Sequence, residues 1–565
     1  MSTLTVKQTP SPVEHVDRCV RELADAREKL AKLSLAQRRE LMQDCLDRTV
    51  QLAREWVDAA CEAKGIAPGS TLRAEEVTAG PASTVRHLRL LINNYEALER
   101  EGHIPLPAPP QQKPDGTLTV QVTPVKGIFD TIAFAGFKAT AHLGPQVKRA
   151  DLDRLGSELV KPSGAQTVLV LGAGNVSSIP ATDTISKVFQ ETSVVLLKMN
   201  PVNEYLGPIF QRLFKRLIDE GFVRIIYGGA EVGAAAVEHP QVDEVHITGS
   251  IHSHDMITWG PPGEERERRK REHDPVLKKR ITSELGNVSP WIVVPGPYTE
   301  KELRFQAESL ATSIVNNASF NCVATKMIVT HKAWPQREQF LKMVEEVMSR
   351  VPRRKAYYPG ARDRFERFSG QQAPPESDGT LPWTLVRNAD PEAMPQLFCE
   401  ESFVCVCAEI ALEAPDERAF LNAAVDFAND RLWGTLSAAL TVHPSFRKDP
   451  HGAECFDAAL ENLRYGAVGV NHWPALVYAM MSPPWGGYPS GTLEDAQSGI
   501  GSVHNTFMLE HVQKTVLEGP LVIWPKPIWF PTHKNPEPVA WKMLALCHQP
   551  SAWKLPGLMF SAMGG

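Results

Sequence analysis

Residues 167–250 decide the fold of this 565-residue chain. They hold four short, almost continuously apolar runs rich in β-branched residues: TVLVL at 167–171, SVVLLK at 193–198, FVRIIY at 222–227 and EVHIT at 244–248. Segments with the apolar spacing of helices, such as residues 204–220, separate these runs. Alternating strands and helices predict a parallel sheet covered on both faces, with a ligand crevice at the carboxyl ends of its strands. We therefore expect a nucleotide site at that edge.

A second alternating region follows, from about residue 291 to residue 471. Its strand candidates are IVV at 292–294, TKMIVT at 325–330, VCVCAEIAL at 404–412, SAALTV at 437–442 and AVGVN at 467–471. Nearer the amino terminus, SLAQ at 34–37 has the form of a capping box, and apolar residues then recur at steps of three and four as far as Gly65, which predicts one long helix. TLTVQV at 117–122 alternates like a strand, and an irregular region is expected after it, up to about residue 162.

The composition excludes several classes of protein. Hydrophobic residues make up 43% and charged residues 22%, as in ordinary globular proteins. The net charge is −6, from 60 lysines and arginines against 66 aspartates and glutamates, so nucleic acid is not an expected partner. The nine cysteines include no Cys-x-x-Cys pair, which favours free thiols in a reducing compartment. Neither a signal peptide nor an apolar run near the ~20 residues of a membrane span is apparent, so the expected location is the cytoplasm.

Two segments lie outside these patterns. Residues 264–280 (EERERRKREHDPVLKKR) interleave both signs of charge and are expected to form a solvated surface loop. Residues 520–565 set four tryptophans among prolines, lysines and apolar residues. This tail could form a lid, a subunit contact or a membrane-surface segment, and we favour packing against its own chain or a neighbouring subunit.

Single motifs decide little. GAGN at 172–175 follows a strand, but the ordinary dinucleotide fingerprint fails, because Ser177 holds the third glycine position and Lys198 stands where an acid is expected. TGS at 248–250 closes a strand and opens a helix, where unpaired backbone N–H groups can hold a pyrophosphate. Taken alone, Cys322 is more often a buried core cysteine than a nucleophile.

The ordered set of motifs is more informative. It comprises GAGN at 172–175, LLKMN at 196–200, HPQVDEVHITGS at 239–250, SELGN at 283–287, NASFNC at 317–322 and CEESF at 399–403, with FANDRLWGTLSAAL, GAVGVN and PWGGYPSG further along. In this order the motifs resemble those of the aldehyde dehydrogenase superfamily, from about residue 34 to residue 516. The resemblance implies an α/β fold with two parallel-sheet domains, a Rossmann-like cofactor domain and a catalytic domain, plus small oligomerisation strands. The implied domains are 1–283 (amino-terminal helices and NAD(P)-binding domain, with an oligomerisation strand at about 117–124), 284–484 (catalytic), 485–519 (return to the cofactor domain and a second oligomerisation strand) and 520–565 (a Pro/Trp-rich extension).

The resemblance also implies roles for individual residues. Cys322 matches the family's nucleophile, Glu284 its general base, and Asn175 the asparagine whose side-chain amide stabilises an oxyanion. The implied cofactor-binding residues are Lys198 at the adenosine ribose, Gly249 and Ser250 at the phosphate turn, Gly286, and Glu401 and Phe403 around the nicotinamide ribose and ring. NAD is the implied cofactor. NADP stays possible because Met199, Asn200 and Pro201 follow Lys198 where the family has Pro-Ser-Glu, so the carboxylate that would hold the adenosine ribose is missing.

These residue types are chemically coherent without the family name. A cysteine thiolate adds to an aldehyde carbon, two N–H donors hold the oxyanion, a nicotinamide accepts the hydride, and a carboxylate activates the water that hydrolyses the thioester. The sequence therefore predicts NAD(P)-dependent oxidation of an aldehyde to a carboxylic acid. Two alternatives are an enzyme that passes the thioester to coenzyme A, or runs backward as an acyl-CoA reductase, and a catalytically silent binding or structural homologue.

Further expectations concern the substrate and the partners. Phe320 and Trp473 are expected to line an apolar tunnel, which predicts an apolar aldehyde. His254 replaces the last glycine of the family's phosphate turn, which predicts a shifted cofactor at that helix. Two histidines at 252 and 254 are more often incidental than metal ligands, so no metal is expected. The family resemblance implies a homodimer or homotetramer assembled through the strands near 117–124 and 512–517.

Overall fold

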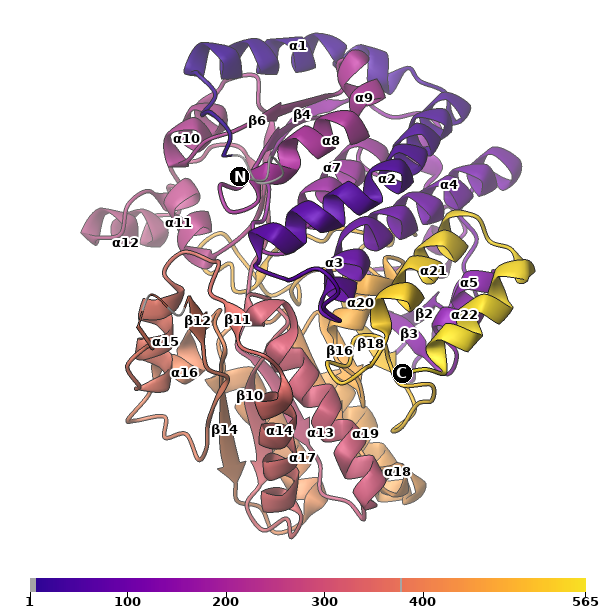
Figure 1. The fold of residues 1–565 in the computed structure, drawn as a ribbon. Helices are drawn as coiled ribbons and strands as arrows, with labels where there is room; N and C mark the ends of the chain where they lie inside the picture. Colours follow the sequence, from indigo (N-terminus) through magenta and orange to yellow (C-terminus); the bar gives the residue numbers. More distant parts are fainter. Residues whose placement is uncertain (1–6, 376, 378) are drawn as a thin grey trace.

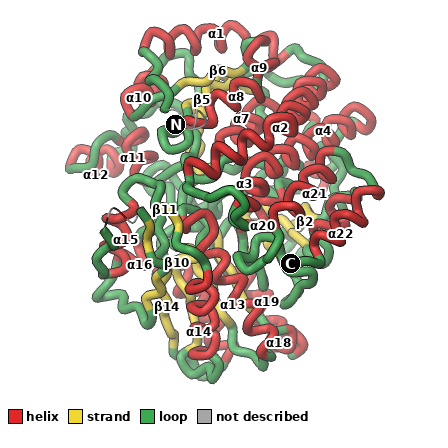
Figure 2. Tube along the Cα trace, viewed as in Figure 1, coloured by secondary structure: helices red, strands yellow, loops and turns green. Residues whose placement is uncertain are grey.

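Two large sheets organise the protein, in a computed structural model that describes residues 7–375, 377 and 379–565. Helices flank both sheets, one of which lies in the upper half of Figure 1 and the other in the lower half (Figures 1 and 2). A third sheet pairs only β11 (Arg354–Lys355) with β12 (Thr380–Leu381). The predicted aldehyde-dehydrogenase-like α/β fold is confirmed.

The six-stranded sheet is built from the apolar runs of residues 167–250. Its order is β17, β8, β7, β4, β5, β6, and every neighbouring pair is parallel except β17 with β8. The bounds are β4 (Gln166–Leu171), β5 (Ser193–Lys198), β6 (Val223–Ile226), β7 (Glu244–Thr248), β8 (Arg280–Glu284) and β17 (Gly499–Ile500). From β4 the chain builds the sheet first toward β6 and then toward β8, so the switch point of the strand order lies between β4 and β7. Ligands bind at such points, beyond the carboxyl ends of the strands.

The ten-stranded sheet joins strands from distant parts of the chain. Its order is β1 (Gln111–Gln112), β2 (Leu118–Thr123), β3 (Lys138–Leu143), β18 (Val512–Glu518), β16 (Ala467–Val470), β15 (Ser437–Thr441), β9 (Ser289–Val293), β10 (Thr325–His331), β14 (Val406–Leu412) and β13 (Thr384–Val386). The strands from β18 to β13 are parallel, while β1, β2 and β3 extend the sheet in antiparallel fashion. The two expected oligomerisation strands are thus present as β2 and β18. β3 pairs with both of them and joins β2 to the larger sheet. It is a strand within the stretch that the sequence predicts to be irregular.

Helices pack on both sheets. α1 (Val13–Ala31) lies against β4, β5 and β6, and α7 (Ile179–Phe189) lies against β4 and β5. α2 (Leu35–Ala63) begins at the predicted capping box, where the Ser34 hydroxyl and the Gln37 side chain each accept from the other residue's backbone N–H. The other helices are α3 (Arg73–Val77), α4 (Ser83–Glu101), α5 (Ile128–Ala133), α6 (Arg149–Leu152), α8 (Gly207–Leu213), α9 (Lys215–Asp219), α10 (Ala230–Glu238), α11 (Ile251–Trp259), α12 (Glu264–Arg271), α13 (Glu300–Val315), α14 (Arg337–Arg350), α15 (Ala361–Ser369), α16 (Gln396–Cys399), α17 (Glu417–Arg431), α18 (Pro444–Lys448), α19 (Pro450–Asn462), α20 (Ala475–Met480), α21 (Pro536–His548) and α22 (Leu555–Ala562).

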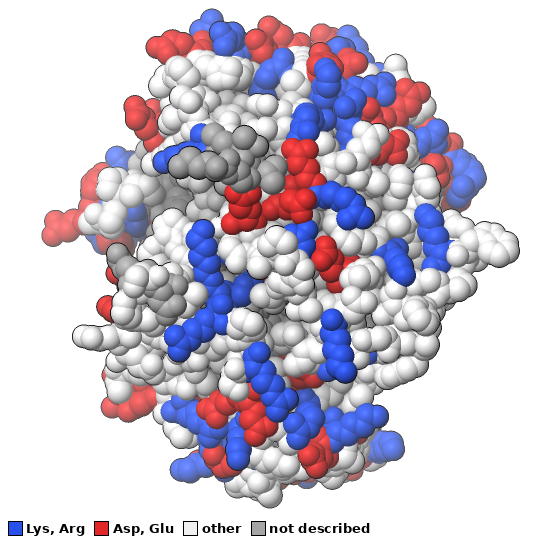
Figure 3. All heavy atoms as spheres, in the orientation of Figure 1, with Lys and Arg blue, Asp and Glu red and all other residues white. Residues whose placement is uncertain are grey.

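The charged insertion is not wholly a loop, because residues 264–271 form the helix α12. Ion pairs one helical turn apart stabilise it: Arg268 pairs with both Glu265 and Glu272, and Arg269 also pairs with Glu265. The prediction that these residues are largely solvated holds for most of them. Figure 3 shows acidic and basic side chains interleaved over most of the visible surface.

The carboxyl-terminal tail packs on its own chain. α21 lies against α3, α4 and α5, and α22 lies against α21 (Figure 1). Val539, Ala540 and Leu544 are buried in this contact, whereas Trp524 and Trp553 stay 77% and 94% exposed. The sequence favoured packing of this tail either on its own chain or on a neighbouring subunit. α21 packs on its own chain.

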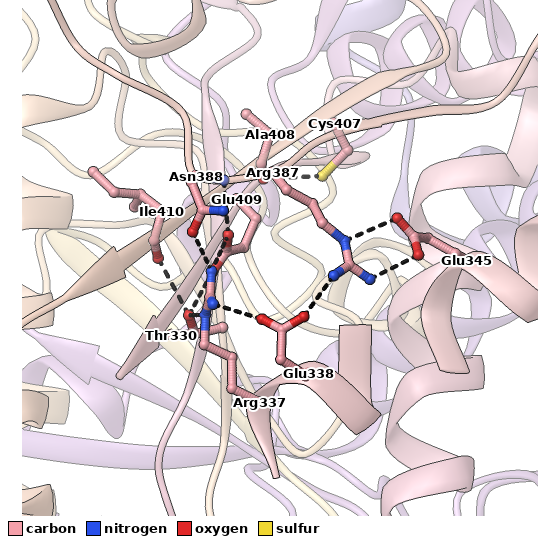
Figure 4. Close-up of polar contacts among 10 residues, drawn as sticks. All are labelled: Thr330, Arg337, Glu338, Glu345, Arg387, Asn388, Cys407, Ala408, Glu409 and Ile410. Carbon is pink, nitrogen blue, oxygen red and sulfur yellow. Dashed lines mark hydrogen bonds and ion pairs between the residues drawn. The ribbon is translucent and has the colours of Figure 1, made fainter. Parts of the chain in front are cut away.

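A buried ion pair links α14 to the ten-stranded sheet. Figure 4 shows the guanidinium of Arg337 facing the carboxylate of Glu409 on β14, with both oxygens within 2.8 Å of Nη2. Thr330 donates to the same carboxylate at 2.5 Å, and the backbone N–H of Asn388 donates to it at 3.1 Å. Every oxygen of this fully buried carboxylate is thereby satisfied, which is the condition under which a buried ion pair is retained.

Glu409→Gln should lower the free energy of unfolding by about 3–5 kcal/mol, because it removes the buried counter-charge of the Arg337 guanidinium and leaves only the exposed carboxylate of Glu338. The matched control is Glu413→Gln, which removes a pair with Lys332 whose side chains are 76% and 63% exposed. That control should leave the free energy of unfolding close to that of the wild type, because an exposed ion pair contributes little. Denaturant unfolding of both variants at neutral pH tests this, and equal losses would contradict the assignment.

Candidate active site

A cavity of about 950 Å³ is lined from both large sheets. Thr248 and Glu284 reach it from the carboxyl ends of β7 and β8, and Cys322 reaches it from the turn before β10. The first turn of α11 lines one end, and side chains of the tail line another. The crevice expected at the ends of the parallel strands and the expected nucleophile therefore share one space.

Cys322 follows a strained turn between α13 and β10. Residues 317–319 are not glycines, yet their φ angles are +51°, +57° and +66°, a conformation that costs of order 1–3 kcal/mol per residue. The side-chain amide of Asn317 holds the turn by donating to the carbonyl oxygens of Asn175 (3.0 Å) and Phe320 (2.9 Å). Backbone strain that the surroundings enforce in this way is concentrated at functional sites.

The Cys322 thiol is half-buried at the cavity wall. Burial raises its pKa, and the nearby carboxylates of Glu401 and Glu284 raise it further. Both carboxylates therefore lie close enough to interact with a charge on this sulfur. Because the neutral thiol is favoured here, the sulfur has to lose its proton to a base before it can act as a nucleophile.

Asn175 lies on the turn after β4, and its side chain is directed at the Cys322 turn. The side-chain amide donates to the carbonyl of Phe320 at 3.1 Å. A primary amide carries two N–H donors, so a second one is available to a group bound beside Cys322. The turn needs a glycine at its centre, because a Cβ on Gly174 would lie 2.7 Å from the side-chain oxygen of Asn200.

Glu284 is the last residue of β8, and its side chain is buried at the cavity wall. Burial raises its pKa well above the ordinary value, and the charge of Asp183 raises it further. Among the described residues, its Oε1 has no hydrogen-bond partner. The carboxyl group is therefore poised to exchange a proton with a molecule in the cavity. Cys322, Asn175 and Glu284, the three predicted catalytic residues, are brought together here.

Glu401, Phe403 and Gly286 line the same cavity. Burial raises the pKa of Glu401 to about 7, against the opposing charges of Lys326 and Arg364. A Cβ on Gly286 would lie 1.9 Å from Oε2 of Glu401, so only glycine permits this approach. These three predicted cofactor-binding residues therefore form one wall beside Cys322.

Gly249 and Ser250 line the far end of the cavity, where α11 begins. The Ser250 hydroxyl accepts from the backbone N–H of Ser253 at 3.2 Å and caps the helix. The amino end of a helix of this length favours an anion such as a pyrophosphate. His254, at the position normally held by glycine, is buried within the helix.

Lys198 is not brought to the cavity lining. Its ammonium group is buried 3.4 Å from the carbonyl of Met199, and burial lowers its pKa. The charge of Glu204 opposes that shift, so a carboxylate does lie near Lys198. This carboxylate belongs to Glu204, six residues after Lys198 and outside the motif on which the resemblance rests.

Comparisons with known proteins bear on the fold and on the family. The model of the aldehyde dehydrogenase family matches residues 117–359. An indole-3-acetaldehyde dehydrogenase in complex with NAD+ matches with a TM-score of 0.58 and 18% identity, over 91% of this chain and 91% of that one. The aldehyde dehydrogenase KauB from Pseudomonas aeruginosa matches with a TM-score of 0.58 and 18% identity, over 92% of this chain and 91% of that one.

The chain has the fold of the aldehyde dehydrogenases, and its residues 117–359 match the model of that family.

The sequence likeness to this family is local. 4-Trimethylaminobutyraldehyde dehydrogenase A from Danio rerio is 25% identical over 160 residues, 28% of this chain. The matched stretch spans only 27% of that relative's length. The fold is therefore shared, while activity has to be argued from the residues of the cavity.

One prediction about the cavity lining is wrong. Phe320 does not line the cavity, because the left-handed turn before it directs its ring into an aromatic cluster. Its centroid lies 4.9 Å from that of Tyr357, 5.6 Å from that of Tyr358 and 5.9 Å from that of Phe403. Trp473 does line the cavity, as predicted, and its indole N–H donates to the carbonyl of Val323.

Metal-ligand clusters and membrane-spanning helices are both absent from the described residues. No group of three or more histidine, cysteine, aspartate or glutamate side chains in residues 7–375, 377 and 379–565 is placed to hold a metal ion. In the same ranges, no helix has the length and apolar character needed to cross a bilayer.

Proposed function

We propose that this protein oxidises an apolar aldehyde to a carboxylic acid, with NAD or NADP as the hydride acceptor. The observation that carries the proposal is the meeting of Cys322, Asn175 and Glu284 at one cavity. The wall of Glu401, Phe403 and Gly286, together with the amino end of α11, supports a dinucleotide in the remainder of that cavity. Bound there, the dinucleotide would supply the acceptor for the hydride.

The protein's own residues supply the covalent chemistry. The thiol of Cys322 first gives its proton to a neighbouring carboxylate of the cavity. The sulfur then forms a bond to the aldehyde carbon, and the resulting oxyanion accepts from the free N–H of the Asn175 amide and from the backbone N–H of Cys322. Loss of hydride leaves a thioester on Cys322. Glu284, as a carboxylate, then takes a proton from the water that attacks the thioester. Its position at the same cavity favours hydrolysis over transfer to coenzyme A.

A panel of aldehydes assayed with NAD and with NADP tests the activity. Stopped-flow mixing should show a burst of reduced nicotinamide followed by slower turnover, with the free acid as the product. An acyl-CoA product formed only when coenzyme A is added would instead support the acylating alternative. If neither dinucleotide raised the thermal stability at ~100 times a plausible dissociation constant, where about 2.7 kcal/mol is expected, the silent homologue would be favoured.

The outer part of the cavity supports an apolar substrate. Its lining there is formed by Phe129 and Phe134 near α5, Trp473 near α20, and Trp529 and Met543 of the tail. Such a wall offers an aliphatic or aromatic chain many contacts. The guanidinium of Arg86 also lines the cavity and lies over Phe129 and Phe134, but it is already paired with Asp130. The tail is thus part of the proposed substrate site.

Met543→Trp should shorten this part of the cavity. The kcat/KM for the longest accepted aldehydes should fall on the order of tenfold to a hundredfold, while that for acetaldehyde and propanal stays unchanged. Met559→Trp is the matched control, because Met559 is 42% exposed on α22 and does not line the cavity. A uniform loss across all chain lengths would argue against a role of α21 in substrate selection.

A further inference from the structure

A row of buried polar side chains runs away from Glu284, between α7 and the six-stranded sheet. Alternate residues of a strand share one face, so Glu244, His246 and Thr248 of β7 lie beside Arg280, Thr282 and Glu284 of β8. α7 contributes Asp183 and, one turn later, Lys187. Asp183, Lys187, Glu244 and His246 are each only 1% exposed. A helix-to-sheet contact is ordinarily apolar, so four ionisable groups in one of them require an explanation.

These side chains form a connected chain of polar contacts. Thr248 donates to Oδ2 of Asp183 at 2.9 Å, and the same oxygen lies 3.6 Å from Nε2 of His246. Nδ1 of His246 lies 2.9 Å from the hydroxyl of Thr282, which donates to Glu244 at 3.1 Å. Carboxylate, imidazole and hydroxyl groups can each accept one proton and release another. The contacts from Asp183 to Glu244 therefore have the polarity that stepwise proton transfer requires.

The outer end of the row reaches solvent. Glu244 pairs with Arg280 at 3.0 Å, and the Arg280 side chain is 64% exposed. Lys187 bridges Glu244 (2.8 Å) to Glu191 (2.9 Å), whose side chain is 32% exposed. The buried carboxylate of Glu244 thus lies one residue from bulk water on two sides.

The inner end reaches the cavity. Thr248 and Glu284 are paired in the register of β7 and β8, and both line the cavity. The charge of Asp183 acts on Glu284, which places the two carboxyl groups near each other. Thr248 donates to Asp183 and is the register partner of Glu284, so its hydroxyl connects the two carboxyl groups in space.

Other ionisable groups also face Asp183. Nε2 of His504, from the loop after β17, lies 3.6 Å from Oδ1 of Asp183, and the ring of Tyr478 on α20 packs against His504. His87 of α4 packs against His504 as well, and burial lowers the pKa of His87 to about 3, so it stays neutral. Burial opposes ionisation of Asp183, but the contacts of His246 and His504 outweigh it and lower its pKa. Asp183 is therefore ionised in the resting protein, and it would hold a transferred proton only transiently.

Hydrolysis at Cys322 creates a proton that has to leave a buried place. As water oxygen bonds to the thioester carbon, one proton of that water passes to the Glu284 carboxylate, and the carbon–sulfur bond breaks with its electron pair on sulfur. Glu284 is then neutral and cannot serve again until it loses this proton. We propose that Asp183, His246, Thr282 and Glu244 carry that proton from Glu284 to solvent. This inference rests on the proposed hydrolytic function, and these four are positioning residues, because they touch no substrate.

The test compares His246→Gln with the wild-type protein in stopped-flow assays. The variant should keep the burst of reduced nicotinamide, because hydride loss precedes hydrolysis. Its steady-state rate should fall on the order of tenfold, and added imidazole should restore that rate in proportion to its concentration, as an external base replaces the lost one. His331→Gln is the matched control, since His331 is also buried but bonds the carbonyl of Ala414 beside the ten-stranded sheet. It should show neither effect.

A second variant protects the test against a folding defect. Thr282→Val keeps the volume of the side chain and interrupts the row between His246 and Glu244, so it should show the same imidazole-dependent loss. Unchanged turnover in both variants, or a loss that imidazole does not restore in either, would overturn the relay. Absence of a burst from the wild-type protein would instead refute the proposed function, so the two failures are distinguishable.

Discussion

Cys322→Ala is expected to abolish the burst of reduced nicotinamide and to lower turnover by on the order of 10⁴-fold to 10⁶-fold. Cys322 lines the cavity together with Asn175 and Glu401, and its sulfur is the nucleophile in the mechanism that we propose. Without it no covalent adduct forms, and the aldehyde has no route to hydride loss. Rapid mixing with aldehyde and either dinucleotide measures the burst directly.

The control for this variant is Cys455→Ala, which alters a half-buried cysteine of α19 that does not line the cavity. It should leave both the burst and the turnover unchanged. A full burst from Cys322→Ala, with an unaltered thermal unfolding profile, would exclude Cys322 as the nucleophile.

Glu284→Gln is expected to separate the two halves of the reaction. The burst should persist, while hydrolysis of the thioester should slow by about 10²–10⁴-fold, the scale of a lost general base. The variant should therefore accumulate the thioester, which acid quenching and mass measurement of the intact protein can detect. Glu413→Gln, at an exposed carboxylate, should behave as wild type.

The pH dependence follows from the raised pKa of Glu284. A carboxyl group whose pKa lies above its ordinary value is protonated over a wider range, and only its ionised form can accept a proton. Hydrolysis in the wild-type protein should thus accelerate as pH rises, over a range that lies above the ordinary titration range of a carboxyl group, and Glu284→Gln should lose this dependence. A variant with normal turnover, or with an unchanged pH profile, would assign the base to another group.

Local sequence patterns predicted the parts of the fold that local physics determines. The four runs of residues 167–250 became the core strands of the six-stranded sheet, because apolar β-branched residues suit strands buried on both faces. The predicted capping box at Ser34 is present in the structure. β3 was missed, since KATAHL alternates only weakly and is stabilised by its pairing with β2 and β18. The pairing of β3 with β18 joins residues 138–143 to residues 512–518, and a partner so distant in the sequence leaves no local signal.

The motif residues of the candidate site could be predicted from the sequence, but the arrangement of the residues around them could not. Cys322, Glu284 and Asn175 could be proposed from their motifs, and the structure shows that one cavity holds them. Asn317 was overlooked as a holder of the strained turn, because a left-handed run of residues other than glycine has no sequence signature. The prediction that Phe320 lines the cavity was wrong for the same reason, since the turn sets the direction of its ring.

The buried row beneath Glu284 illustrates a different limit. A strand that reads Glu-Val-His-Ile-Thr appears half polar, and the usual inference would expose its polar face to water. Only the packing of α7 onto that face reveals that Asp183 and His246 meet there. Patterns within one element cannot show which second element covers it.

The wall formed by α21 also bears on how the molecule matures. α21 meets α3 and α4, so two segments near opposite ends of the chain meet beside the substrate cavity. During synthesis the strands and the cysteine turn emerge from the ribosome long before this helix does. The cavity therefore lacks its outer wall for a period, and it is completed only when the last helices dock.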